Sequence, residues 1–130
     1  MYTINCSVHF DAAHYLNYYS GKCKEIHGHR WQIGVQVSGE ELDEAGILID
    51  FHHIKRYLRE ITETWDHHLL NQIAPFDRIN PTSENLARYI YEYVEGKLSE
   101  EFPRLHLDHV EVYETPEAKA IFSKSKEVKA

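Results

Sequence analysis

The sequence predicts an α+β domain in which a four-stranded antiparallel sheet carries two helices on one face. Apolar residues alternate along two segments near the start of the chain, which indicates half-buried strands. Two middle segments repeat their apolar residues at spacings of three and four, which indicates amphipathic helices. Two shorter alternating segments follow. The order strand, strand, helix, helix, strand, strand is typical of such a layered domain.

The expected strands cover residues 2–14, 27–37, 105–114 and 118–123. The first two are separated by a polar segment that contains Gly21, so we expect them to pair antiparallel across a loop. One face of the first strand carries Tyr2, Ile4, Cys6, Val8, Phe10, Ala12 and His14. One face of the second carries His27, His29, Trp31, Ile33, Val35 and Val37.

Each expected helix has a start signal and an apolar stripe. The first begins at Asp50, and its stripe is Phe51, Ile54, Leu58, Ile61 and Trp65. The second begins within residues 80–84, where a proline stands among capping side chains, and Pro103 ends it. Its stripe is Leu86, Ile90, Val94 and Leu98.

Length and composition indicate one globular domain over residues 1–130, with an apolar fraction of 42%. The formal net charge of -7 argues against general affinity for nucleic acid or anionic membranes, which require a basic surface. The first residues lack the basic stretch and apolar core of a signal peptide, and no apolar run is long enough to span a bilayer. We therefore expect a cytoplasmic protein whose Cys6 and Cys23 stay free thiols.

Three of the ten histidines are expected to converge. His27 and His29 are two apart on one strand, so their side chains point to the same apolar face. His14 ends the neighbouring strand on that strand's apolar face. Clustered, buried imidazoles are costly, and a divalent metal relieves the cost. Three nitrogens and an open fourth position are typical of catalytic zinc, whereas the alternative is three separate, hydrogen-bonded core histidines.

Other residues are candidates for acid-base chemistry. Cys23 lies in the loop that leads to His27 and could be activated by a nearby metal or imidazole, although an ordinary loop thiol fits equally well. Asp66 beside His67 could orient the imidazole, as in catalytic relays. His68 could equally be the active histidine, and polar residues at a helix end are the simpler interpretation.

Glu114 is the polar end of an otherwise apolar strand face that includes Val110 and Val112. A carboxylate there could accept two hydrogen bonds from a guanidine-like ligand edge. The alternative is a strand that simply leaves the core.

Six segments together resemble the 6-pyruvoyltetrahydropterin synthase and 6-carboxytetrahydropterin synthase family. They occur in family order and are Phe10–His14, Cys23–His29, Asp50–Phe51, Asp66–Asn71, Pro81–Asn85 and Val112–Thr115. The resemblance implies a tunnelling fold, in which three subunits close a barrel and two such rings stack as a homohexamer, a dimer of trimers. It also implies zinc on His14, His27 and His29.

The resemblance implies that Cys23 abstracts protons and that Asp66 and His67 are its proton-relay partners. The implied substrate is 7,8-dihydroneopterin triphosphate, whose side-chain hydroxyls and forming carbonyls zinc would polarise. No redox cofactor is implied. The pterin ring would be anchored by Glu114, Thr82 and Ser83.

Two branches of the family share these motifs. The prokaryotic branch forms 6-carboxy-5,6,7,8-tetrahydropterin, a queuosine and deazapurine precursor, and releases acetaldehyde and triphosphate; this compact chain looks closer to that branch. The alternative branch forms 6-pyruvoyltetrahydropterin. A third branch has Glu directly after or in place of the cysteine, whereas here Lys24 follows Cys23 and Glu25 comes one residue later. A non-catalytic pterin- or metal-binding protein is the alternative of a different class.

Overall fold

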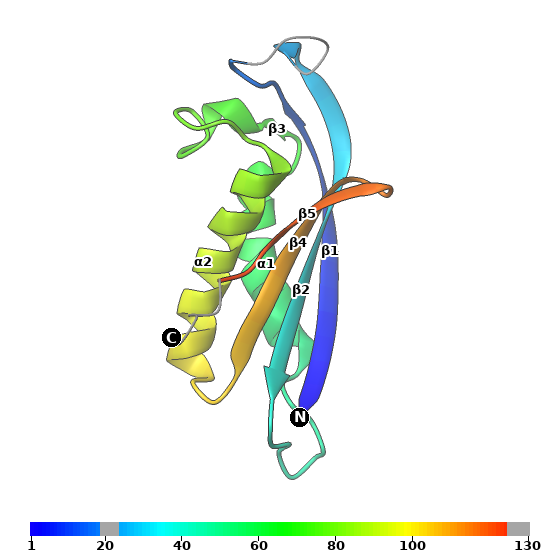
Figure 1. Cartoon of the computed structure of the whole chain (residues 1–130), viewed down its shortest axis with the longest axis vertical. Helices are drawn as coiled ribbons and strands as arrows, with labels where there is room; N and C mark the ends of the chain where they lie inside the picture. Colours follow the sequence, from blue (N-terminus) through cyan, green and yellow to red (C-terminus); the bar gives the residue numbers. More distant parts are fainter. Residues whose placement is uncertain (19–23, 125–130) are drawn as a thin grey trace, which may run out of the picture.

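The two helices lie together on one face of a twisted sheet (Figure 1). The computed structural model describes residues 1–18 and 24–124. Along the chain, the elements are β1 (Tyr2–His14), β2 (His27–Gly39), α1 (Phe51–Trp65), β3 (His68–Leu69), the 3₁₀ turn η2 (Leu70–Gln72), α2 (Ser83–Glu101), β4 (His106–Thr115) and β5 (Ala118–Phe122). In the described ranges, neither helix is long and apolar enough to cross a membrane.

The sheet contains the four predicted strands and one more. The strand order is β3-β1-β2-β4-β5, and the four longer strands pair antiparallel, as predicted. β3 is a two-residue strand that runs parallel to β1 beside Ala12 and Ala13. Two residues are too short to carry a period-two pattern, which is why the sequence gives no sign of β3.

β1 and β2 form the longest pairing in the sheet. Their register runs without a shift from Tyr2 opposite Gly39 to His14 opposite His27. β4 accompanies β2 only from Gln32 onward, so the first part of β2 has β1 alone as its strand neighbour. The β1–β2 ribbon therefore extends past the β4–β5 hairpin (Figure 1). The three candidate histidines lie in this extension.

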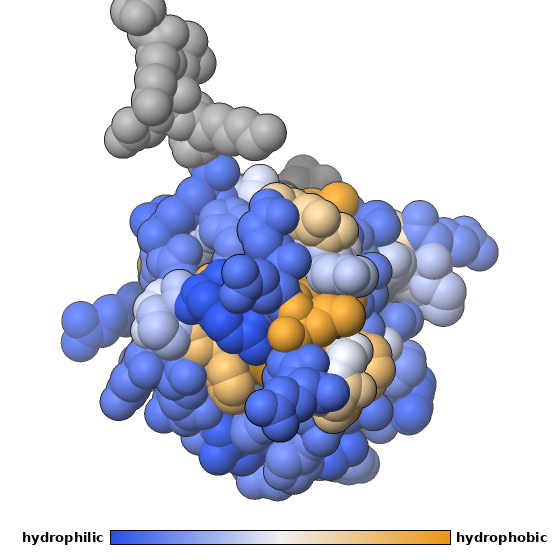
Figure 2. Space-filling view, turned by 90° about the horizontal axis from the view of Figure 1, so that it is seen from below, coloured by the Kyte–Doolittle hydropathy of each residue, from blue (hydrophilic) through white to orange (hydrophobic). Residues whose placement is uncertain are grey.

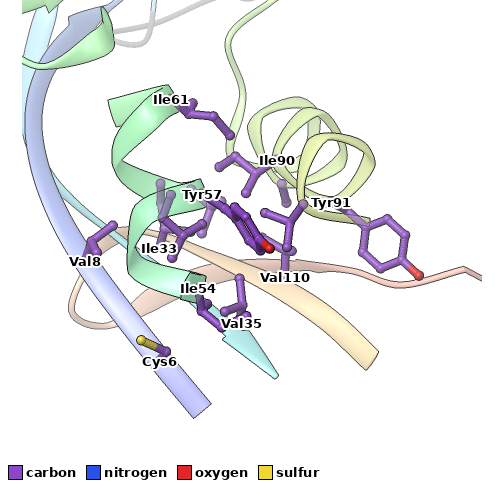
Figure 3. Close-up of a cluster of buried hydrophobic side chains, with 14 of the residues drawn as sticks. Cys6, Val8, Ile33, Val35, Ile54, Tyr57, Ile61, Ile90, Tyr91 and Val110 are labelled. Carbon is purple, nitrogen blue, oxygen red and sulfur yellow. The ribbon is translucent and has the colours of Figure 1, made fainter. Parts of the chain in front are cut away.

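The core lies between the sheet and the helices, as the alternation predicted (Figure 3). α1 and α2 begin one residue after their capping side chains: Asp50 accepts from the backbone N–H of His52 at 2.9 Å, and Thr82 accepts from that of Asn85 at 3.1 Å. Such caps satisfy amide groups that the first turn leaves unpaired. Phe51 differs from its predicted role in the core stripe, because about half of it is exposed.

The end of the molecule near the N-terminus shows apolar side chains among polar ones (Figure 2). Tyr2, Leu42, Ile47 and Phe51 are exposed there and line a groove of about 450 Å³. Arg104 holds the adjoining loop by donating to the carbonyls of residues 41 and 48. An apolar groove of this kind is typical of an interaction surface.

We expect the same substitution, glycine to alanine, to have opposite effects on stability at two positions. A Cβ on buried Gly39 would lie 2.7 Å from Leu105 and 2.9 Å from Leu48, whereas one on Gly96 of α2 would meet no atom within 4 Å. Gly39→Ala should destabilise the fold by about 1–3 kcal/mol through overpacking. Gly96→Ala should stabilise it by about 0.4–1 kcal/mol, because alanine restricts the unfolded chain. Urea denaturation of both variants checks the signs, and equal effects would contradict the packing described at Gly39.

Candidate metal centre

The three predicted histidines converge at the end of the β1–β2 pairing. His14 stands directly opposite His27, and His29 is opposite Ala12. The ring centroids lie 4.5 Å apart for His14 and His27, 5.3 Å for His14 and His29, and 4.9 Å for His27 and His29. The period of two along β2 therefore brings all three imidazoles to one face.

Aromatic side chains form the floor beneath these rings. Trp31 is fully buried. Its ring lies edge-to-face with the rings of His14 and His29, at centroid distances of 4.9 Å and 5.4 Å. The Trp31 indole N–H donates to the carbonyl of Ala12 at 3.1 Å. Phe10 stacks on the indole with the ring centroids 6.0 Å apart. This packing limits the movement of the histidines and keeps water from their inner side.

Two of the imidazoles are held in a defined tautomer. His14 Nδ1 lies 2.8 Å from the carbonyl oxygen of Pro81, and His27 Nδ1 lies 2.7 Å from that of Glu25. A carbonyl oxygen only accepts hydrogen bonds, so each Nδ1 carries the proton and donates. Each Nε2 then presents a lone pair toward the centre of the cluster. Metal-binding histidines in proteins are oriented by such carbonyl contacts.

Glu114 completes the group because it continues the face of β4 that carries Val110 and Val112, which pair with Val35 and Ile33 of β2. Tyr113 pairs with Lys119 and Thr115 with Ala118, so Glu114 has no partner in the register with β5. The bulge thus leaves Glu114 unpaired on the β5 side of β4, at the point where its side chain reaches the histidines.

A single oxygen of Glu114 faces all three rings. Glu114 Oε1 lies 3.2 Å from His14 Nε2, 2.9 Å from His29 Nε2 and 3.9 Å from His27 Nε2. One ligand atom from each of the four residues lies within 4.8 Å of the others. The contact with His29 lacks the alignment of a hydrogen bond, and among the described residues this buried nitrogen has no partner.

The charges in the cluster leave a place for a cation. Burial lowers the pKa of His14 and of His29, although the Glu114 carboxylate opposes this effect. His14 Nε2 lies within hydrogen-bond distance of Glu114 Oε1 at 3.2 Å, which a ring with a proton on both nitrogens satisfies, whereas a neutral ring with its proton on Nδ1 would point a lone pair at that oxygen, which is repulsive. A divalent metal between them removes the repulsion, and imidazole nitrogens with a carboxylate oxygen are a ligand set that zinc accepts. These four residues could therefore hold a metal ion.

Asp66 and His67 form a dyad at the other edge of β1. Asp66 Oδ2 lies 2.9 Å from His67 Nδ1, a contact that favours a proton on Nδ1 and leaves Nε2 free to accept one. Asp66 Oδ1 accepts from the Asp11 amide at 2.8 Å, and the His67 amide donates to the Asp11 carbonyl at 2.5 Å. The Asp11 amide and then the His67 ring hold the pKa of the Asp66 carboxyl below its usual range.

One residue of the dyad and one residue of the histidine cluster line the same depression. His29 and His67 both line a shallow depression of about 370 Å³ on β1 and β2. His68 differs from His67, because its Nδ1 donates to the backbone carbonyl of Asp66 at 2.7 Å. Of the two candidate histidines, His67 is therefore the one in contact with the carboxylate.

The other predicted site residues have separate positions. Thr82 caps α2 with its hydroxyl, and Ser83 is the first residue of that helix. Both follow Pro81, whose carbonyl orients His14. Cys23 lies outside the described residues. The carbonyls of Pro81 and Glu25 were missed by sequence reasoning, because a backbone acceptor leaves no residue-type signal.

Comparisons with known proteins agree with this fold and show the family. The sequence profile of the family described as 6-pyruvoyl tetrahydropterin synthase matches residues 3–125. A relative from Bacillus subtilis (strain 168), named 6-carboxy-5,6,7,8-tetrahydropterin synthase, is 32% identical over 130 residues, with 96% of this chain and 87% of the relative covered. A protein of the same name from Synechocystis sp. is 36% identical over 121 residues and covers 88% of each chain.

The solved structure of Caenorhabditis elegans 6-pyruvoyl tetrahydropterin synthase matches with a TM-score of 0.81 and 28% identity. It covers 95% of this chain and 96% of its own. The fold and the cluster define an α+β protein with a histidine cluster on a β-ribbon that could hold a metal ion. The chain belongs to the 6-pyruvoyl tetrahydropterin synthase family.

The lowered pKa values predict how pH affects the metal-free protein. The unfolded chain binds protons on His14 and His29 near their ordinary pKa of about 6.5, whereas the folded chain binds them only at lower pH. The contribution of the two neutral histidines to the free energy of unfolding is thus fully present above about pH 6.5. It is lost as the pH falls toward the pKa values of the folded state. Urea denaturation with a chelator across this range should show the loss. His14→Gln should flatten the slope, and the exposed control His52→Gln should not; equal slopes would contradict the prediction.

Proposed function

We propose that this protein is a zinc-dependent lyase that converts 7,8-dihydroneopterin triphosphate to 6-carboxy-5,6,7,8-tetrahydropterin, with release of acetaldehyde and triphosphate. The observation that carries the proposal is the convergence of three Nε2 atoms on Glu114 Oε1 in a chain of this family. The names of the bacterial relatives support the carboxy-forming branch. The product is a precursor for queuosine and related deazapurines.

The metal ligands in this proposal are His14, His27 and His29, which leaves the fourth position open to substrate. When bound, zinc supplies Lewis-acid polarisation of the oxygens on the substrate side chain. The protein holds the ligands for this task through the carbonyl contacts of His14 and His27 and through the Trp31 floor.

Proton movement is assigned to Cys23, Asp66 and His67. Asp66 keeps the His67 proton on Nδ1, so His67 Nε2 can accept a proton and return it at another atom. Cys23 is the residue that abstracts protons from the substrate carbon chain, and His67 is its relay partner. The shared hollow of His29 and His67 supports a common site.

The pterin ring is assigned to Glu114, with Thr82 and Ser83 beside it. A carboxylate accepts a pair of N–H donors from an aminopyrimidine edge with good geometry. The contact of Glu114 with the histidines supports a second possibility, in which it is a fourth metal ligand. Zinc content of a Glu114 variant separates the two roles.

The free edges of the sheet support a closed oligomer; we propose that it is cytoplasmic and built from one domain of residues 1–130 per subunit. The outer edge of β5 has no strand neighbour in the described part of the chain, and β1 has only the short β3. Free edges tend to pair, and closing a ring removes them. We propose a homohexamer of two stacked trimers, with a small pterin as ligand and no nucleic acid or membrane as partner. Light scattering tests the oligomer.

The alternative product is 6-pyruvoyltetrahydropterin, formed by triphosphate elimination without loss of acetaldehyde. The high structural similarity to the Caenorhabditis elegans protein of that name favours keeping this second candidate. Mass identification of the product distinguishes the branches. A chain that binds pterin and metal without turnover would instead be a binding protein.

Metal content is the first test of the proposed site. The wild-type protein should bind one zinc per chain, and His29→Ala should lose stoichiometric zinc while remaining folded, because one of three ligands is missing. Glu114→Gln should keep zinc and weaken pterin binding. Elemental analysis and pterin titration of the same preparations measure both effects. Full zinc occupancy in His29→Ala would sink the ligand assignment, and zinc loss in Glu114→Gln would make Glu114 a ligand.

The two cysteines offer a matched test of catalysis. Cys23→Ala should retain zinc and pterin binding and lose turnover by roughly a hundred- to ten-thousand-fold, the usual contribution of an acid-base group. Cys6→Ala should affect mainly stability, because Cys6 is a buried core residue of β1. The measurement is the steady-state rate with 7,8-dihydroneopterin triphosphate. A near-normal rate in Cys23→Ala would remove Cys23 from the mechanism.

A further inference from the structure

Two asparagine side chains hold the backbone immediately after His14. Asn71 Oδ1 accepts from the Tyr15 amide at 3.0 Å, and Asn71 Nδ2 donates to the Tyr15 carbonyl at 2.9 Å. Asn80 Oδ1 accepts from the Asn17 amide at 2.9 Å, and Asn80 Nδ2 donates to the Asn17 carbonyl at 2.8 Å. Each amide thus reproduces the paired donor and acceptor of a neighbouring strand. We call this pair of side chains the asparagine clamp.

The clamp comes from two segments on the helix side of the sheet. Asn71 belongs to η2 and is buried, while Asn80 precedes the cap of α2. The carbonyl of Asn80 accepts from Asn85 Nδ2 at 2.9 Å, which ties this segment to the first turn of α2. The residue after Asn80 is Pro81, whose carbonyl accepts a hydrogen bond from His14 Nδ1.

The clamp therefore fixes His14 from two sides. Asn71 holds the backbone of the next residue, Tyr15. Asn80 ties the Pro81 segment to Asn17, and Pro81 orients the imidazole. β1 ends at His14, and its ladder with β2 ends there too. Beyond that point the clamp supplies the backbone pairing that strand neighbours supply elsewhere.

We propose that Asn71 and Asn80 are positioning residues of the metal centre, which act by fixing the backbone after His14 and the Pro81 carbonyl that orients its ring. The proposal rests on the proposed zinc site. Site geometry must hold within about 0.5 Å for full function. Loss of an outer partner of a metal ligand typically weakens metal binding by about 10- to 100-fold.

The sharpest variants are Asn71→Asp and Asn80→Asp, which keep the size of the side chain. Aspartate can still accept from the backbone amide, but it cannot donate and so places a carboxylate oxygen against a carbonyl oxygen. If these asparagines only filled space, an isosteric change to aspartate would not alter zinc binding. The added negative charge alone would strengthen cation binding, so weaker binding isolates the lost hydrogen bond.

The experiment compares zinc affinity by chelator competition with the visible absorption of the cobalt-loaded proteins. The variants are Asn71→Asp, Asn71→Ala, Asn80→Asp and Asn80→Ala. Asn5→Asp, at an exposed position of β1, is the matched asparagine control. Ile90→Val in the core controls for general destabilisation. Amide hydrogen exchange at Tyr15 and Asn17 in the metal-free proteins reports the clamp itself.

We expect the clamp variants to bind zinc about 10- to 100-fold more weakly, to change the cobalt absorption bands and to lose amide protection at the clamped residue. The two controls should match the wild type. Wild-type affinity and an unchanged cobalt spectrum in the clamp variants would overturn the proposal. If the Asn71 variants do not fold, the less buried Asn80 decides the outcome.

The same measurements separate this proposal from the proposed function. Wild-type protein that binds zinc but does not turn over the pterin would refute the enzyme activity and leave the clamp supported by affinity and spectrum. Wild-type protein that binds no zinc would overturn the metal centre and the clamp's role in it together.

Discussion

The antiparallel register of β1 and β2 decides whether the three histidines of the candidate metal centre meet. It places His14 opposite His27 and, two residues along, His29 opposite Ala12. Because side chains alternate across a strand, a slip of one residue would turn one set of histidines to the other face of the sheet. The apolar residues of both strands prevent that slip, since it would also expose Trp31 and its neighbours. Core packing and ligand geometry thus depend on the same register.

The electrostatics of the cluster follow from that register. Burial favours neutral rings at His14 and His29, and backbone carbonyls keep the protons of His14 and His27 on Nδ1. The inward lone pairs of neutral rings then meet the carboxylate of Glu114, which continues the buried face of β4. While the rings are neutral and no cation is bound, this arrangement is repulsive; a second proton on His14 relieves it through a hydrogen bond from Nε2 to Glu114. A site that is unfavourable when empty and favourable with a divalent metal is expected to bind metal tightly, because the protein has already oriented the ligands.

Sequence patterns predicted most of the fold because the strands bury one face and the helices bury one stripe. The same alternation predicted that His14, His27 and His29 would share a face. Three features escaped prediction for physical reasons. β3 is too short for a period, the bulge at Glu114 depends on pairing with β5, and backbone acceptors such as that of Pro81 have no side-chain signature. The contact between Asp66 and His67 likewise needed the backbone conformation, since adjacent residues in a sequence do not usually face one another.

That conformation links the dyad to the metal centre through β1. His67 has a φ of 59°, a left-handed value that is uncommon for a residue with a side chain. It is held there by the bond from its amide to Asp11, while Asp66 accepts from the Asp11 amide on the same strand. Strained residues persist where their surroundings fix them, and here the anchor lies three residues before His14. β1 therefore carries His14 of the candidate metal centre at its end and the support of the dyad just before it, so the spacing between the two is set by one strand that pairs with both β2 and β3.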